Sequence, residues 1–149
     1  MRTVIQRVSH GQVEVDGQTT GRIDRGLLVY LSVGNGDTIS DAEFIAEKLV
    51  NLRIFPDEKG KMNLSVRDVG GSILLISQFT LHGDCRKGRR PGFDGAAEPV
   101  LARQLYEQTI ELIKQQNVSV ATGVFAAHMH VTSTNDGPVT FLLDSSRQF

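Results

Sequence analysis

An apolar run of four residues constrains the fold of this chain more than any other feature of its sequence. Ile73, Leu74, Leu75 and Ile76 follow two glycines and end at Ser77. A short run of branched and apolar residues bounded by glycine is typical of a strand buried on both faces, although periodicity alone does not separate it from a short buried helix. We predict a doubly buried strand here.

The segment that follows this predicted strand carries polar hydrogen-bonding groups. Ser77, Gln78, Phe79 and Thr80 bring two hydroxyls, a carboxamide and an aromatic ring to the end of a rigid element, where binding and catalytic sites are commonly built. The structural alternative is that the polar residues cap the strand end and that Phe79 belongs to the core. The segment alone leaves both interpretations open.

Size and composition indicate one globular domain spanning residues 1–149. At this length about two-thirds of the unfolded surface can be removed from water, and 40% hydrophobic and 22% charged residues are ordinary for a soluble protein. No apolar run approaches the roughly 18 residues that a membrane span needs. The charged start, Met1 to Arg7, does not fit a signal peptide, and the single cysteine, Cys85, fits a reducing compartment. We therefore expect a cytoplasmic protein that does not enter membranes.

The charge distribution restricts how the chain could contact nucleic acid. A formal net charge of -1 at pH 7 excludes a basic coat, so any RNA contact must come from a local cluster. The segment Arg86-Lys87-Gly88-Arg89-Arg90-Pro91 is such a cluster and suits phosphate oxygens. A solvated charged loop explains this segment equally well.

The rest of the chain predicts a sheet interrupted by two helices. Strands are expected at 2–8, from 13 to an Asp16-Gly17 hairpin turn, at 19–23, and at 26–34, the last of them central. Ser40 and Glu43 have capping-box spacing at the start of a first helix that ends before Pro56, and a second helix is expected at about 98–116. Three short strands at 118–125, 129–134 and 139–143 close the chain. This order predicts an α+β fold with a curved, mixed or mostly antiparallel sheet and two main helices.

The segment Asn135-Asp136-Gly137-Pro138 lies between the last two predicted strands. All four residue types favour turns, so a hairpin connection is the simplest interpretation. Gly-Pro is also a dipeptide in which a cis peptide is accessible, because the tertiary amide reduces the trans preference to about 0.5–1 kcal/mol. A cis bond would turn two consecutive carbonyl oxygens to one side, and two convergent acceptors suit an ammonium group.

Two further groups of residues have side chains that can take part in chemistry. His128 and His130 would share one face of a strand, but two ligands without a third do not make a metal site, and we expect neither a metal nor another cofactor. The cations beside Cys85 could favour its thiolate. No His and Asn or Asp partner can be assigned to it, so an exposed, incidental thiol is the better interpretation.

Several motifs taken together resemble the D-aminoacyl-tRNA deacylase family. They are Gln6-Arg7-Val8, Asn51-Leu52-Arg53-Ile54-Phe55, Gly60-Lys61-Met62-Asn63, Ser77-Gln78-Phe79-Thr80-Leu81, the basic cluster at 86–91, and Gly137-Pro138-Val139-Thr140. The resemblance runs from Met1 to about Asp144. His82, Cys85 and His128 depart from the family pattern, in which an aromatic, a small polar residue, and an acidic or other polar residue would be expected.

The resemblance implies a cytoplasmic homodimer that hydrolyses the ester between a D-amino acid, or glycine, and the 3′-terminal adenosine of tRNA. It implies chiral proofreading in translation, in which L-aminoacyl-tRNA is rejected. It further implies that Gly137-Pro138 is cis and reaches into the partner subunit's pocket, with Arg7 close by to hold it. Arg86, Lys87, Arg89 and Arg90 would then contact tRNA.

An aminoacyl ester is already activated, so the protein need only position it, stabilise an oxyanion and deliver water. We expect Phe79 and Thr80 to supply backbone N–H donors while Ser77 and Gln78 shape the pocket wall. The resemblance implies that the ribose 2′-hydroxyl of the substrate assists the water. Thr80 as a covalent nucleophile would need an adjacent base, and none lies within the motif, although a residue distant in sequence could fold next to it.

Two other classes of function compete with this interpretation. An RNA-binding module without activity would normally show stacking aromatics along a strand face, whereas aromatic residues total 6% here and form no such stripe. A generic esterase or peptidase would need a nucleophile elbow such as Gly-x-Ser-x-Gly, which the sequence lacks.

Overall fold

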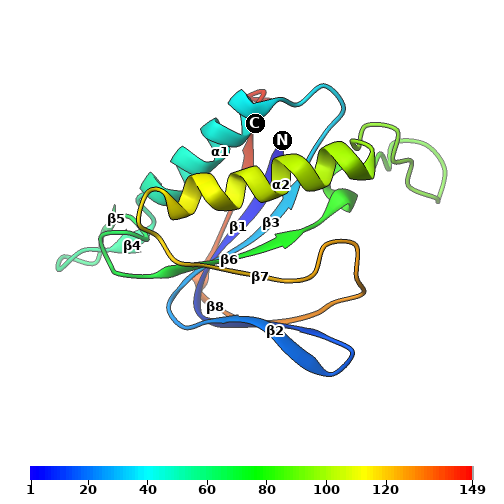
Figure 1. Cartoon of the computed structure of the whole chain (residues 1–149). Coiled ribbons are helices and arrows are strands. Elements are labelled where there is room, and N and C mark those ends of the chain that lie inside the picture. Colours follow the sequence, from blue (N-terminus) through cyan, green and yellow to red (C-terminus); the bar gives the residue numbers. More distant parts are fainter. Residues whose placement is uncertain (149) are drawn as a thin grey trace.

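The computed structural model describes residues 1–148 and forms one strongly curved sheet with two helices packed on one face (Figure 1). The strand order is β2 (Gln18–Ile23), β1 (Arg2–Val15), β3 (Gly26–Ser32), β6 (Ser72–Ser77) and β7 (Val120–Thr122), and β8 (His130–Asp144) pairs with β1 outside this path. The sheet is mixed, as predicted, because β1 is antiparallel to β2, β3 and β8 while β3, β6 and β7 run parallel. The α+β class with two main helices is confirmed.

The remaining elements are α1 Ile39–Asn51, β4 Phe55–Pro56, β5 Met62–Leu64, the 3₁₀ helix η1 Phe79–His82 and α2 Pro99–Lys114. The short strands β4 and β5 pair with each other in a separate two-stranded sheet. Parallel neighbours cannot be joined by a hairpin. The chain therefore passes through α1 between β3 and β6, and through α2 between β6 and β7. No helix among residues 1–148 is long and apolar enough to cross a membrane.

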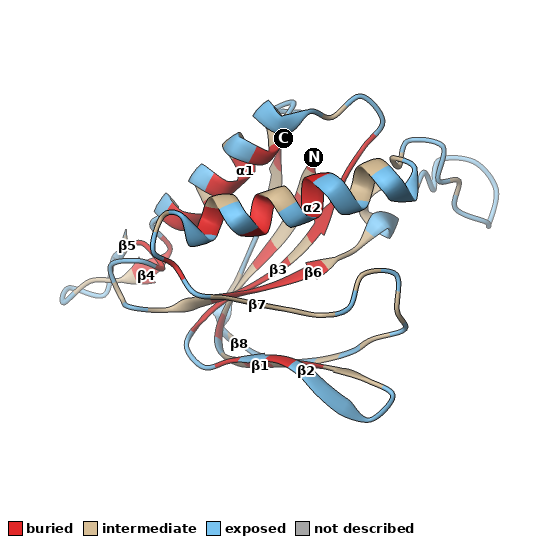
Figure 2. Ribbon diagram, viewed as in Figure 1, coloured by how far each residue is buried: buried red, intermediate tan, exposed pale blue. Residues whose placement is uncertain are grey.

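The predicted strand at 73–76 is confirmed as β6, and its two faces contribute to two separate apolar clusters. Ile73 and Leu75 pack into the cluster beneath the helices, and Leu74 and Ile76 into the one on the opposite face of the sheet. All four side chains are at most 1% exposed. Figure 2 shows this burial along β3 and β6 and on the inner sides of α1 and α2. Because each fully buried aliphatic side chain contributes roughly 1.5–3 kcal/mol, β6 fixes the sheet rigidly where its carboxyl end emerges.

The amino-terminal hairpin forms as its turn residues predict. Asp16 and Gly17 both have positive φ, 51° and 77°, which is the conformation of the hairpin turns that match strand twist. The strand that enters this turn is longer than expected, however. β1 runs without interruption through the two predicted strands at 2–8 and 13–15.

The prediction of a hairpin at Asn135–Pro138 is wrong. The strands expected at 129–134 and 139–143 are one strand, β8, which pairs with β1 along nearly its whole length. Gln6 faces Thr140 and Val8 faces Asn135, so two steps along β1 match five along β8, and the surplus residues bulge out opposite Arg7. Turn-forming residues also suit a bulge, and the long partner strand β1 decides between the two outcomes.

The prediction for the start of the first helix is also wrong in detail. α1 begins at Ile39, so Ser40 already lies inside the first turn and Thr38 is the N-cap. The Asp41 carboxylate accepts hydrogen bonds from the Thr38 N–H at 2.8 Å and from its hydroxyl at 3.0 Å. The same four-residue capping spacing therefore occurs two residues earlier than expected.

Candidate functional site

A cavity of about 540 Å³ opens where the parallel strands β3 and β6 end. Sites of small ligands commonly lie outside the carboxyl ends of parallel strands, because the loops that follow them diverge there. Its wall comes from the ends of β3 and β6, from the first turns of α2 and from the segment before β8: Leu31, Ser32, Val33, Ile76, Ser77, Gln78, Phe79, Ala96, Ala97, Pro99, Ala102, Tyr106, Phe125, Ala126, Ala127, His128, Met129 and Val131. A more open groove of about 670 Å³ along α2 contains none of the site residues selected from the sequence.

Three of the four predicted catalytic residues line this cavity. The Gln78 N–H donates to the Leu31 carbonyl at 2.8 Å, which ties the end of β6 to β3. Phe79 then begins η1, and its ring packs edge-on against Phe93 with centroids 5.0 Å apart. The first amide groups of a helix have no acceptor inside it. Phe79 and Thr80 are the first two residues of η1, so their N–H groups have no acceptor within this helix.

Thr80 lies beside the cavity rather than in its wall. Its hydroxyl accepts a hydrogen bond from the Gln78 side-chain amide at 2.5 Å. Within residues 1–148, no histidine or carboxylate makes a hydrogen bond to that hydroxyl. A covalent role for Thr80 would need such a base.

The inner wall contains residues that sequence reasoning did not select. Tyr106 is buried, its hydroxyl donates to the Leu75 carbonyl at 2.7 Å, and burial raises the pKa of this phenol. Phe125 and Met129 add apolar surface opposite the end of β6. Five alanines complete the wall, and a residue without a functional group carries no sequence signal for a site. The small side chains at 96–97, 102 and 126–127 leave open space in the wall.

His128, which the sequence analysis set aside as a metal ligand, lies in the cavity wall. Its ring stands perpendicular to that of His130 with centroids 5.0 Å apart. Residues 1–148 contain no group of three or more side chains arranged to hold a metal ion. Cys85 is exposed, as expected for an incidental thiol.

Gly137 and Pro138 do not line the cavity of their own chain. They are exposed in the bulge of β8, and the peptide bond between them is cis. Arg7 fastens this bulge: its Nε donates to the Asp136 carbonyl at 3.0 Å and pairs with the Asp136 carboxylate at 3.1 Å, and its Nη1 donates to the Ile54 carbonyl at 2.7 Å. In the sheet, Arg7 of β1 lies opposite Leu27 of β3. The cavity begins at Leu31, which is about 13 Å farther along β3 at 3.3 Å per residue.

Comparison with known proteins identifies the family. A family model described as D-Tyr-tRNA(Tyr) deacylase matches residues 4–144. Proteins named D-aminoacyl-tRNA deacylase are 58% identical in Clostridioides difficile (strain 630) and 56% identical in Thermosipho africanus (strain TCF52B), in both cases over 149 residues and the whole length of both chains. The chain belongs to the D-Tyr-tRNA(Tyr) deacylase family. The resemblance drawn from the motifs is confirmed, and the chain is an enzyme of the deacylase type.

Two solved structures share the fold of this deacylase-family chain. One, named c-Myc DNA Unwinding Element Binding Protein, superposes with a TM-score of 0.91 at 37% identity and covers 97% of this chain and 98% of its own. The other, a probable eukaryotic D-amino acid tRNA deacylase, has a TM-score of 0.78 at 18% identity, with 95% and 97% covered. At that identity the second structure supports the fold alone.

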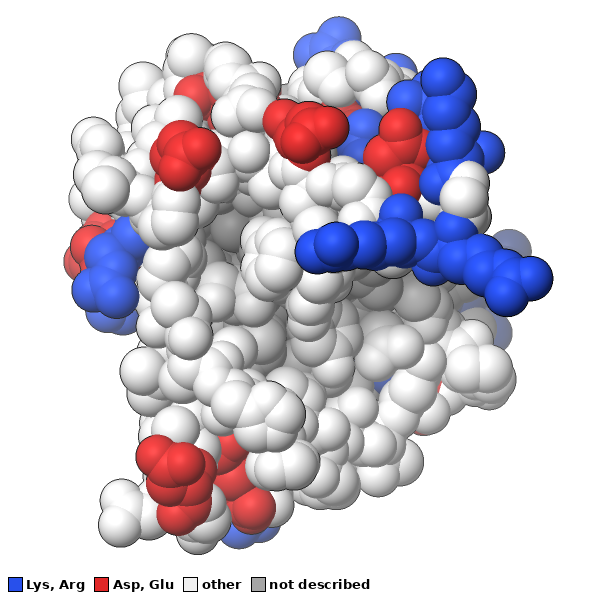
Figure 3. Space-filling model, turned by 90° about the vertical axis from the view of Figure 1, so that its right-hand side faces the viewer, with Lys and Arg blue, Asp and Glu red and all other residues white. Residues whose placement is uncertain are grey.

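The basic cluster of this family member lies on the loop between η1 and α2. Arg86 is paired with Asp84 through two bonds of 2.9 and 2.7 Å, and these bonds hold the pKa of the Asp84 carboxyl well below its usual range. Lys87, Arg89 and Arg90 are exposed, and no ion pair among residues 1–148 includes them. Figure 3 views the molecule from this side and shows Lys and Arg side chains projecting over uncharged, hollowed surface.

Proposed function

We propose that this protein hydrolyses the ester bond between a D-amino acid, or glycine, and the 3′-terminal adenosine of tRNA. The observation that carries the proposal is a cavity whose wall includes Ser77, Gln78 and Phe79, where β6 ends and η1 begins, in a chain that matches the deacylase family from residue 4 to residue 144. The names of the relatives support the substrate class. Because this substrate is used in translation, the proposal places the protein in the cytoplasm.

The proposed reaction needs positioning and electrostatic stabilisation more than a strong nucleophile. Water attacks the ester carbonyl carbon, and the N–H groups of Phe79 and Thr80 stabilise the oxyanion, at about 2.7–4 kcal/mol per donor. The bond to the ribose oxygen then breaks, which releases the amino acid and a tRNA with a free 3′-hydroxyl. Ser77 and Gln78 shape the wall, and the 2′-hydroxyl of the substrate assists the attacking water. No cofactor enters this scheme.

The apolar part of the cavity suits the terminal nucleoside. Phe125, Met129 and Tyr106 provide surface against which a nucleobase can pack, and a volume of about 540 Å³ falls within the usual range of small-ligand sites. Aromatic surfaces stabilise a bound base by stacking regardless of its hydrogen-bonding edge. The ester would then lie at the open end, beside η1.

The proposal assigns chirality to the Gly137-cisPro138 backbone of a second subunit. In a homodimer, this bulge would insert into the partner's cavity, where two carbonyls hold the α-ammonium and the backbone excludes an L side chain. A D side chain would point to solvent, and glycine would fit both ways. Specificity made by a clash rejects every L-amino acid, however small.

Three observations support the two-subunit arrangement. The bulge is exposed and lies far from the cavity of its own chain. Arg7 holds it in one orientation through Asp136. Phe141 and Leu142, farther along β8, are 38% and 61% exposed, so large apolar side chains near the bulge are available to a second subunit. Activity should therefore fall on dilution together with dissociation measured by sedimentation, and a fully active monomer would remove the cross-subunit part of the proposal.

The tRNA body would be bound by phosphate contacts from the loop that carries Arg86, Lys87, Arg89 and Arg90. Since Arg86 is already paired with Asp84, the other three cations are the ones available to phosphate. A nucleic-acid-binding protein without activity is the second candidate, favoured by this loop and by the name of the structural neighbour with a TM-score of 0.91.

The deciding experiment incubates pure protein with D-tyrosyl-tRNA and L-tyrosyl-tRNA and measures ester loss. The proposed enzyme should hydrolyse only the D ester. A binding protein would hydrolyse neither, and a generic esterase would hydrolyse both. Either of those results would contradict the proposal.

A further inference from the structure

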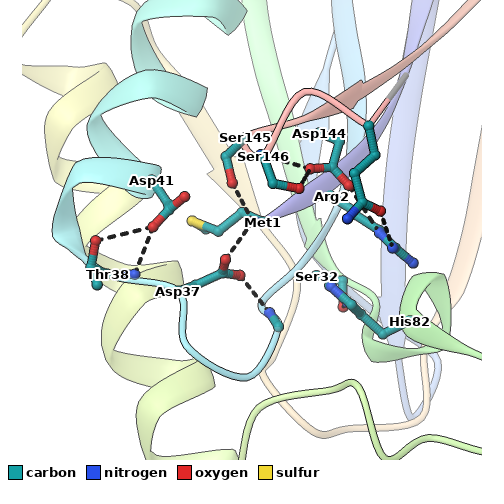
Figure 4. A network of polar contacts seen from close by, with 12 residues as sticks. Met1, Arg2, Ser32, Asp37, Thr38, Asp41, His82, Asp144, Ser145 and Ser146 are labelled. Atoms are coloured by element: carbon teal, nitrogen blue, oxygen red, sulfur yellow. Dashed lines mark hydrogen bonds and ion pairs between the residues drawn. The ribbon is translucent and has the colours of Figure 1, made fainter.

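Ser32, the last residue of β3, connects the cavity wall to both ends of η1. Its side chain is 2% exposed and its residue lines the cavity. The hydroxyl donates to the Phe79 carbonyl at 3.3 Å, and its oxygen lies 2.7 Å from Nδ1 of His82. Figure 4 shows Ser32 and His82 side by side. One hydroxyl therefore contacts the first and the last residue of η1.

The number of hydrogens available fixes how these contacts are made. A serine hydroxyl carries one hydrogen, and a carbonyl oxygen can only accept. Both contacts of Ser32 are satisfied together when Nδ1 of His82 carries a proton and donates it to the serine oxygen, while the hydroxyl donates to the Phe79 carbonyl. His82 is then a donor at Nδ1, and that nitrogen is not available as a base.

The surroundings of His82 keep its ring in place and neutral. Burial lowers the pKa of this imidazole, and the nearby Arg2 guanidinium and Met1 ammonium lower it further, whereas Asp37 and Asp144 act in the opposite direction. Figure 4 shows these groups on one side of the ring. Arg2 also donates to the Leu81 carbonyl at 3.3 Å, which adds a tie between β1 and η1.

The His82 ring also approaches the backbone of Gly34 closely. A Cβ added at Gly34 would lie 2.7 Å from Nε2, closer than real side chains approach. The imidazole therefore packs directly on the glycine backbone.

Holding the Phe79 carbonyl also fixes the N–H of the next residue. The carbonyl of Phe79 and the N–H of Thr80 belong to one planar trans peptide and point in opposite directions. When Ser32 draws the carbonyl toward β3, the Thr80 N–H is directed away from β3. This N–H is one of the two donors in the proposed hydrolysis.

We propose that Ser32 and His82 are positioning residues that orient the peptide between Phe79 and Thr80, so that the Thr80 N–H is set for the oxyanion. This inference rests on the proposed function. The same two residues resemble a serine–histidine nucleophile pair, but the required proton on Nδ1 prevents His82 from activating the hydroxyl.

The first test measures geometry and needs no activity. Long-range ¹H–¹⁵N correlation spectra of the wild-type protein at pH 7.5 should show His82 protonated at Nδ1 and not at Nε2. Ser32→Ala should shift the Thr80 amide signal and speed its hydrogen exchange, while Ser9→Ala, at an exposed serine of β1, should leave it unchanged. A His82 ring protonated at Nε2, or an unmoved Thr80 amide in Ser32→Ala, would overturn the inference.

The second test measures hydrolysis of D-tyrosyl-tRNA. Ser32→Ala should lower kcat about tenfold, a fraction of the 10²–10³ that follows complete loss of an oxyanion donor, with KM changed less than twofold. His82→Asn keeps an amide donor near the Nδ1 position and should retain most of kcat, whereas His82→Leu should match Ser32→Ala. Because both residues act on one peptide, the double variant Ser32→Ala/His82→Leu should lose no more than either single variant.

The outcomes separate this inference from the proposed function. Unchanged kcat in a folded Ser32→Ala, additive losses in the double variant, or an acyl group trapped on Ser32 would overturn the positioning role. A wild-type protein that releases no D-tyrosine would overturn the proposed function, and the spectra of His82 and Thr80 would still test the geometry.

Discussion

Replacing Arg7 by lysine tests how the bulge of β8 is held. The Arg7 side chain is 11% exposed and makes three contacts: with the Ile54 carbonyl at 2.7 Å, the Asp136 carbonyl at 3.0 Å and the Asp136 carboxylate at 3.1 Å. A lysine ammonium is a single point without the planar fork, so it cannot serve Ile54 and Asp136 at once. We expect the bond to Ile54 to persist and the bonds to Asp136 to be lost.

The magnitude follows from the bonds that disappear. A hydrogen bond to a charged group contributes about 1.5–3 kcal/mol, so Arg7→Lys should lower the free energy of unfolding by about that amount. For a chain of this length, 1 kcal/mol corresponds to roughly 2–4 °C in Tm, and we expect a fall of roughly 3–12 °C. Urea unfolding with an unchanged m value would show that stability, and not the compactness of either state, has changed.

The functional effect of Arg7→Lys should be larger on chirality than on binding. Asp136 directly precedes Gly137, so releasing it loosens the segment that we assign to L rejection. We expect the ratio of D-tyrosyl-tRNA to L-tyrosyl-tRNA hydrolysis to fall about tenfold. A tenfold change corresponds to roughly 1.4 kcal/mol, which we assign to the weakened restraint on this segment. Arg22→Lys, at an exposed position of β2, is the matched control and should change neither quantity. Unchanged stability in Arg7→Lys would refute the argument from its bonds, and lost stability with intact chirality would refute the link to Gly137.

Three further predictions concern the catalytic turn, the basic loop and pH. Thr80→Ala should keep activity within about tenfold of wild type, because the Thr80 hydroxyl bonds only to Gln78 among the described residues. Activity of Thr80→Ala at the uncatalysed background would instead indicate that Thr80 is a nucleophile. The combined variant Lys87→Gln/Arg89→Gln/Arg90→Gln should weaken binding of all tRNAs alike and flatten its salt dependence, since phosphate contacts release counterions, and an unchanged slope would make the loop a solvated surface only. Because burial, assisted by Arg2, lowers the pKa of His82 in the folded state, the unfolded chain binds the proton first as pH falls. The stability that neutral His82 contributes is therefore present above pH 6.5 and lost below it. In urea titrations between pH 6.5 and 5, the free energy of unfolding of wild type should fall more than that of His82→Asn. Parallel curves of unfolding free energy against pH would contradict this.

The sequence predicted those elements whose structure depends on neighbouring residues in the chain. The run Ile73–Ile76 reads as a buried strand because every position is apolar, and the Asp16-Gly17 turn follows from two residues that tolerate positive φ. The bulge at Gly137 could not be predicted this way. Its residues suit a hairpin equally well, and the deciding factor is β1, more than 120 residues away in the chain.

The site was predictable in part for a related reason. Ser77, Gln78 and Phe79 stand out because polar groups follow a buried strand directly, and the structure places all three in one cavity. The opposite wall comes from α2 and from 125–129, where alanine, phenylalanine and methionine look like ordinary core residues. The contact between Ser32 and His82 joins residues 50 positions apart, and no spacing rule connects them.

The most direct test of the central claim compares D-alanyl-tRNA with L-alanyl-tRNA. Alanine has the smallest side chain that makes the α-carbon chiral, so size, charge and hydrophobic contacts are the same for the two esters and only the direction of one methyl group differs. The account predicts rapid release of D-alanine and, for the L ester, release no faster than in buffer. Hydrolysis of both esters at similar rates would contradict the claim that the backbone of Gly137 and Pro138 excludes L-amino acids.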